Sequence, residues 1–144
     1  LAEHYDVSAE LWSATSYKRL REEALAVTRW NLLHPTEERR IPMVTRLLSD
    51  VDGPVIAVTD YMRLVPDQVS RWVPKPFTTL GTDGFGRSDA RKALRRHFEV
   101  DTGHIVAATL STLAGEGAVP DTVVRDAFDR YEIDPEAPDP AISR

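Results

Sequence analysis

The sequence predicts an α/β protein in which helices cover both faces of a mostly parallel sheet. A strand is predicted over Pro54–Thr59, because its unbroken β-branched run Val55–Val58 is typical of a strand that is buried on both faces. A second short apolar run, Phe77–Leu80, follows a predicted helix. Amphipathic helical patterns surround both runs, and strands that alternate with helices indicate a three-layer domain.

The first half of the chain is predicted to contain a strand and two helices before the buried strand. Weak alternation of apolar residues predicts the first strand over Glu10–Thr15. Apolar residues at three- and four-residue spacing predict a helix over Tyr17–Leu33, with Ser16 as its N-cap. Pro35 ends this helix, and a charged loop leads to a short helix near Met43–Leu48.

The second half is predicted to be helical, apart from the strand over 77–80. Proline suits the first position of a helix because the amide hydrogen that it lacks has no partner there. Serine and aspartate suit the N-cap, and glycine suits the end of a helix. The predicted helices are Pro66–Val73, Ser88–Phe98 with Leu94 inward, Asp101 to Gly115 or Gly117, and Pro120–Tyr131.

We expect residues 1–133 to form one domain and residues 134–144 to form a tail. A chain of 144 residues is long enough for one hydrophobic core. After Ile133 the sequence reads Asp-Pro-Glu-Ala-Pro-Asp-Pro, which predicts a segment that lies on the surface or is disordered. The first residue is Leu1 rather than methionine, so we expect the chain to be a fragment of a longer polypeptide.

Composition narrows the classes of function. Hydrophobic residues make up 42% and charged residues 28% of the chain, as in ordinary soluble globular proteins. Because the chain has no cysteine, a reducing cytoplasm is the default compartment. The net charge of -5 argues against a general nucleic-acid-binding protein. No apolar run approaches the roughly 18 residues of a membrane span. The absence of cysteine excludes thiolate zinc sites and cysteine nucleophiles.

The stretch from Leu80 to Asp89 is rich in glycine and joins a predicted strand to a predicted helix; we call residues 81–87 the glycine loop. Gly84-x-Gly86 resembles half of a dinucleotide-binding fingerprint, but Asp89 stands where the third glycine should be. Two hypotheses follow. One is an anion- or nucleotide-binding regulatory module that uses the Gly81–Arg87 loop, and the other is a packing loop. A third, a small autonomous Rossmann enzyme, lacks a plausible nucleophile or base.

Asp60 follows the strand around Val55–Val58, and Asp83 follows the next strand, at the edge where open α/β sheets bind ligands. Together with Arg87 they form the best local constellation, and the competing interpretation is a buried salt bridge that fixes two loops. Phe85 and Arg87 are expected to reach a neighbouring domain or a second subunit. The four histidines show no metal-site spacing, and His104 is expected to serve the cap at Asp101 or to face solvent.

Several motifs together resemble the C-terminal domain of the homodimeric, bacterial-type pyruvate dehydrogenases. They are Trp12-Ser13-x-Thr15-Ser16, Arg29-Trp30-Asn31-x-Leu33-His34-Pro35, Thr59-Asp60-Tyr61-Met62, Leu80 through Asp89, and Arg96-His97-Phe98-Glu99-Val100-Asp101. The resemblance runs in order from about Asp6 to Ile133. It implies a transketolase-type C-terminal domain with a mostly parallel sheet of about five strands.

The resemblance also implies a parent enzyme that decarboxylates pyruvate and reductively acetylates the lipoyl group of dihydrolipoyl acetyltransferase. In that family the preceding domains hold thiamine diphosphate and magnesium, through a Gly-Asp-Gly…Asn-Asn motif that is absent here. This chain would then carry no catalytic, cofactor-binding or metal-binding residue, and alone it would be inactive. It would support dimer assembly and the rim of the active-site entrance, with Asp60, Asp83, Phe85 and Arg87 as candidate contacts to the preceding domains or the second subunit.

Overall fold

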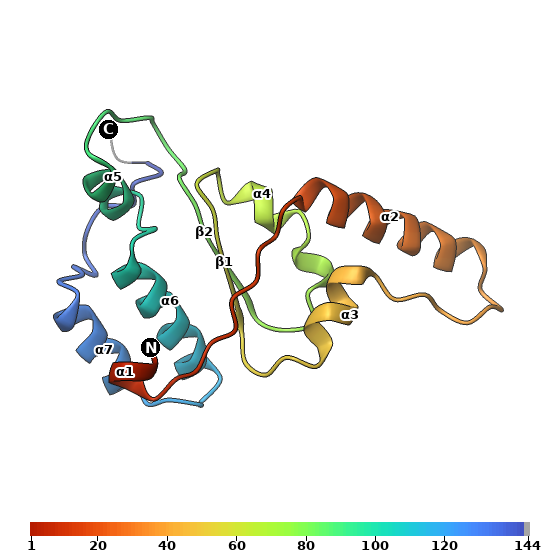
Figure 1. The fold of residues 1–144 in the computed structure, drawn as a ribbon, viewed down its shortest axis with the longest axis horizontal. Helices are drawn as coiled ribbons and strands as arrows, with labels where there is room; N and C mark the ends of the chain where they lie inside the picture. The colour runs from red at the N-terminus through yellow and green to blue at the C-terminus, as the bar shows by residue number, and fades with distance from the viewer. Residues whose placement is uncertain (143–144) are drawn as a thin grey trace.

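The computed structural model describes residues 1–142, in which two parallel strands lie between two groups of helices (Figure 1). The strands are β1 (Val55–Val58) and β2 (Phe77–Leu80). One group of helices comprises α2 (Tyr17–Leu33), α3 (Met43–Ser49), α4 (Leu64–Asp67) and the 3-10 helix η1 (Ser70–Trp72), and the other comprises α1 (Ala2–Tyr5), α5 (Arg91–His97), α6 (Thr102–Gly115) and α7 (Asp121–Arg130). The predicted α/β class, with a parallel sheet covered on both sides, is confirmed.

The two strands pair in parallel, with Val55 opposite Phe77 and Val58 opposite Leu80. The strands predicted around Val55–Val58 and over Phe77–Leu80 are therefore confirmed. The connection between them passes through α4 and η1, as a parallel pair requires a crossover. Because parallel neighbours run in the same direction, the loops that follow β1 and β2 leave the sheet at the same edge.

The main cluster of buried hydrophobic residues lies between α6 and α7. Val106 and Leu110 of α6 and Ala127 of α7 are buried together, and Tyr5 of α1 packs against them. The predicted N-cap of α6 is confirmed, since the Asp101 carboxylate accepts the amide hydrogen of a first-turn residue. The other predicted caps and ends that the structure confirms are Ser16 at the start of α2, Pro120 before α7 and Gly115 at the end of α6.

The predicted first strand, Glu10–Thr15, is wrong. The segment has no regular structure and makes no backbone–backbone hydrogen bond within the described chain, although Figure 1 shows it passing in front of the sheet. Alternating residues become a strand only beside a partner strand, and this segment pairs with neither β1 nor β2. The Leu11 side chain is 98% exposed as a result. The described sheet thus has two strands rather than about five.

Two predicted helices have different bounds in the structure. Pro66 lies inside α4, where its missing amide hydrogen is harmless because the first amides of a helix have no partner. The helix ends at Asp67, and η1 replaces the rest of the predicted span to Val73. Ser88 does not cap α5, which begins three residues later after Ala90.

Candidate functional site

The loop that follows β1 and the glycine loop are joined at the carboxyl edge of the sheet. The Thr82 amide donates to the Tyr61 carbonyl oxygen at 2.9 Å, and the Thr82 hydroxyl donates to the Asp60 carbonyl oxygen at 2.8 Å. Gly81 is buried at this junction, and a Cβ there would lie 2.6 Å from the Tyr61 oxygen and 2.7 Å from the Arg63 nitrogen. The first glycine of the loop therefore permits the close approach of two backbones.

A salt bridge fixes the same two loops, as one of the two interpretations predicted, but it is partly exposed rather than buried. Its cation is Arg63, however, and not Arg87. The Asp83 Oδ2 atom accepts a hydrogen bond from the Arg63 backbone amide at 2.9 Å and another from the Arg63 Nε at 3.0 Å. Sequence reasoning missed Arg63, although its place three residues after Asp60, on the loop that ends β1, was a usable signal.

The structure does not assemble Asp60, Asp83 and Arg87 into one constellation. Asp60 is exposed, and the hydrogen bond that it makes to the glycine loop uses its backbone oxygen. Arg87 donates from Nη1 to Nδ1 of His97 in α5 at 3.0 Å. Because the guanidinium stays charged and can only donate, Nδ1 of His97 is the acceptor in this pair. Arg87 therefore ties the far end of the glycine loop to α5.

The middle of the glycine loop contacts the C-terminal segment. Gly84 has a φ of 101°, and a Cβ there would lie 2.5 Å from the Pro140 oxygen and 3.0 Å from the Ala141 Cα. A residue with a side chain fits neither the conformation nor the space. Gly86, in contrast, has no atom within 4 Å of a Cβ built on it.

Large apolar side chains stand exposed on the two joined loops. Phe85 of the glycine loop is 71% exposed. Tyr61, Met62 and Leu64, on and just after the loop that follows β1, are also more than half exposed. We call these four residues the apolar rim. Gatherings of exposed apolar side chains beside polar ones are typical of surfaces that contact another protein.

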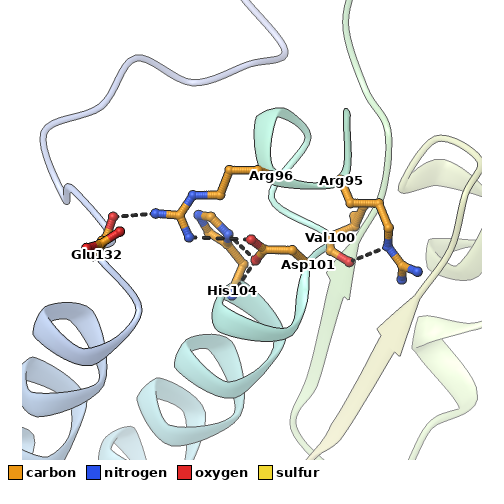
Figure 2. A network of polar contacts seen from close by, with 6 residues as sticks. All are labelled: Arg95, Arg96, Val100, Asp101, His104 and Glu132. Carbon is orange, nitrogen blue, oxygen red and sulfur yellow. Dashed lines mark hydrogen bonds and ion pairs between the residues drawn. The ribbon is translucent and has the colours of Figure 1, made fainter. Parts of the chain in front are cut away.

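A separate polar network joins three helical segments on the α6 side of the sheet (Figure 2). Asp101 Oδ1 accepts from the His104 backbone amide at 3.0 Å and pairs with His104 Nδ1 at 2.7 Å, while Asp101 Oδ2 accepts from Arg96 Nη1 at 3.4 Å. Arg96 also donates to the Glu132 carbonyl oxygen, just beyond α7. The ring contact shows that His104 does more than the predicted cap or solvent role.

The electrostatics of Asp101 reflect these contacts. Burial alone would raise its pKa, but hydrogen bonds from His104 and the nearby positive charges of His104 and Arg96 outweigh burial and lower the pKa below the usual value. The network holds the start of α6 to the end of α5 and to the residues after α7. None of its residues lines either of the two grooves described below.

Two open grooves of about 680 and 880 Å³ lie along α7, and no residue of the glycine loop lines either of them. Over residues 1–142, the side chains form no group of three or more His, Asp or Glu that could hold a metal ion. None of the helices in that range is long and apolar enough to cross a membrane.

Comparison with known proteins identifies the family. Residues 1–101 match the family described as the transketolase-like TK C-terminal domain. The chain is similar to proteins named pyruvate dehydrogenase E1 component, with 47% identity over 93% of the chain in Mycolicibacterium smegmatis, 47% over 97% in Pseudomonas aeruginosa and 42% over 99% in Escherichia coli K12. It spans 14%, 16% and 16% of the lengths of these relatives. The chain belongs to the transketolase-like C-terminal domain family.

Proposed function

We propose that this chain is the C-terminal domain of a homodimeric pyruvate dehydrogenase and that it is a non-catalytic part of that enzyme. The observation that carries the proposal is the identity of 42–47% to pyruvate dehydrogenase E1 components over at least 93% of the chain. The parent enzyme would decarboxylate pyruvate in the cytoplasm with thiamine diphosphate and magnesium held by preceding domains. It would then pass the acetyl group to the lipoyl group of dihydrolipoyl acetyltransferase.

The incomplete packing of the chain supports a role in a larger assembly. Strands β1 and β2 each pair with one neighbour in the described chain, which leaves an edge of each strand free. The extended segment that contains Leu11 exposes that side chain almost completely. The relatives are several times longer than this chain and would supply polypeptide to cover these surfaces.

The two joined loops support a docking role for the carboxyl edge of the sheet. Aromatic and arginine side chains are enriched among the residues that dominate protein interfaces. Phe85 and Arg87 are both exposed on a loop whose ends are tied down by Asp83 and by the Arg87–His97 pair. Fixing the loop in advance reduces the entropy that is lost on docking. We infer that Phe85 and Arg87 contact the preceding domains or the second subunit, near the entrance of the active site.

A chimeric enzyme tests this proposal. The C-terminal segment of the Pseudomonas aeruginosa relative is replaced by the present chain, and a relative that lacks the segment serves as control. We expect the chimera to be dimeric and to decarboxylate pyruvate, and the truncated control to do neither. A folded chimera that is monomeric and inactive would contradict the proposal. Titration of the isolated chain with thiamine diphosphate and magnesium should release no heat of binding, and a stoichiometric isotherm would oppose the non-catalytic role.

The alternative function is an anion- or nucleotide-binding regulatory module on the Gly81–Arg87 loop. One observation favours it, because Arg87 places a positive charge at the exposed end of the loop. Against it, the Arg87 guanidinium already has a partner, and Asp89 adds negative charge nearby in the sequence.

A further inference from the structure

The C-terminal segment 134–142 is built from two similar turns. In the first, the Asp134 carboxylate accepts the Glu136 amide hydrogen at 2.9 Å, and the Ala137 amide donates to the Asp134 carbonyl at 3.1 Å. In the second, the Asp139 carboxylate accepts the Ala141 amide hydrogen at 2.8 Å, and the Ile142 amide donates to the Asp139 carbonyl at 3.1 Å. The segment therefore has a defined path despite its composition.

The second turn is the part that meets the glycine loop. Its residues Pro140 and Ala141 lie so close to Gly84 that a Cβ on the glycine would fall 2.5 Å from the Pro140 oxygen. Pro140 and Ala141 are half-buried, whereas residues 134–139 are exposed. The contact is therefore local to the second turn.

The glycine loop has few other restraints. Within the described chain, residues 83–89 take part in no backbone–backbone hydrogen bond. Side chains tie the loop at Asp83, through Arg63, and at Arg87, through His97. Gly84 lies between these ties, and glycine has more conformational freedom to lose than any other residue. The packed backbone of Pro140 and Ala141 is the restraint at that position.

We propose that residues 134–142 form a strap that holds the glycine loop in the conformation that displays Phe85. The strap contacts Gly84 and leaves the neighbouring Phe85 side chain 71% exposed. It thus restricts the loop without covering the apolar rim. This inference concerns the conformation of the chain itself, so its test is independent of which protein the rim contacts and of any catalytic activity.

Backbone ¹⁵N relaxation of the 144-residue chain tests the strap directly. We expect an order parameter of about 0.8 for the Gly84 amide in the natural sequence and a value below about 0.6 in the Asp139→Ala variant. The Asp139→Asn variant keeps a carbonyl oxygen for the Ala141 amide and should restore the rigid value. Trypsin cleavage after Arg87 should be about tenfold faster in Asp139→Ala than in the natural sequence.

Two controls separate the strap from general loosening. The Asp134→Ala variant breaks the equivalent turn that does not touch Gly84, and it should leave the Gly84 order parameter unchanged. Helix α2 lies on the opposite side of the sheet, so the order parameters of its amides should be the same in every variant. A Gly84 amide that is equally ordered in the natural sequence and in Asp139→Ala would overturn the proposal, as would equal effects of Asp139→Ala and Asp134→Ala.

Discussion

Asp83 holds Arg63 by two hydrogen bonds to one carboxylate oxygen, from the backbone amide at 2.9 Å and from the guanidinium Nε at 3.0 Å. This pair closes the carboxyl edge of the sheet, because it joins the loop that follows β1 to the glycine loop. The Arg63 and Asp83 side chains are partly exposed, so the ion pair itself is screened by water. Its contribution to stability comes mainly from satisfying the Arg63 amide.

The Asp83→Ala substitution should lower the free energy of unfolding by about 1 kcal/mol, because the Arg63 amide loses its acceptor. Urea unfolding followed by circular dichroism measures the change. Asp83→Asn keeps an oxygen acceptor and should lower the free energy of unfolding by less. The matched control is Asp60→Ala, since the exposed Asp60 side chain makes no hydrogen bond in the described structure. A loss for Asp60→Ala as large as for Asp83→Ala would contradict this account.

Gly81 and Gly86 should respond very differently to alanine. At Gly81 the new Cβ would lie 2.6 Å from the Tyr61 oxygen, and the backbone of one loop must move. We expect a loss of more than about 2 kcal/mol in unfolding free energy, as for other overpacked sites. Gly86→Ala meets no atom within 4 Å and should change stability by less than about 1 kcal/mol. Similar thermal unfolding of both variants would disprove the close-approach role of Gly81.

The depressed pKa of Asp101 predicts how stability depends on pH. Its folded-state pKa lies below the ordinary value of an aspartate, so the ionised carboxylate favours the folded state at pH values above the unfolded pKa. This contribution should be lost as the pH falls through the folded pKa, below about pH 4. Urea unfolding at pH 7, 5, 4 and 3 measures it. In the Asp101→Asn variant, the free energy of unfolding should fall less steeply as the pH is lowered. An identical fall in the variant and the natural sequence would rule out the contribution of Asp101.

Phe85→Ala should weaken the dimer of the chimeric enzyme while leaving the isolated chain stable. Burying a phenylalanine contributes about 1.5–3 kcal/mol, so the dimer dissociation constant should rise at least about tenfold. Analytical ultracentrifugation of the chimera gives this constant, and thermal unfolding of the isolated chain gives its stability. Leu32→Ala is the control, because Leu32 is equally exposed but lies on α2, away from the apolar rim. An unchanged dimer dissociation constant would show that Phe85 does not contribute to the interface.

The alternative anion-binding function and the packing-loop interpretation make opposite predictions for Arg87. If the Gly81–Arg87 loop binds phosphate groups, phosphate-bearing metabolites should raise the melting temperature of the chain, and Arg87→Ala should abolish the rise. Differential scanning fluorimetry across a metabolite panel measures this. We expect no rise, because Arg87 is already paired with His97. A rise that depends on Arg87 would favour the regulatory module over the packing loop.

Sequence patterns predicted those parts of the fold that depend on local signals. The β-branched run at Val55–Val58 and the cap at Asp101 carry such signals, and the structure confirms both. The strand expected over Glu10–Thr15 carries an alternating pattern too, but a pattern does not specify a partner, and none lies beside it in the described chain.

The sequence predicted the position of the candidate site, but not which residues join its two loops. The loops after β1 and β2 meet, as the parallel topology required, yet the cation that joins them is Arg63 rather than Arg87. Arg63 and Arg87 lie on the two different loops and both are exposed, so the hydrophobic pattern does not indicate which of them pairs with Asp83. The contact of Gly84 with Pro140 joins segments far apart in the chain, and no local pattern encodes such a meeting.

The free edges of β1 and β2 bear on how such a chain matures in the cell. An unpaired strand edge recruits any extended segment that it meets, whether that segment is native or comes from another molecule. A chain with two unpaired strand edges and an exposed Leu11 side chain is therefore vulnerable to edge-to-edge aggregation until those edges are covered. For this domain, the order in which surfaces are covered after synthesis matters as much as its final stability.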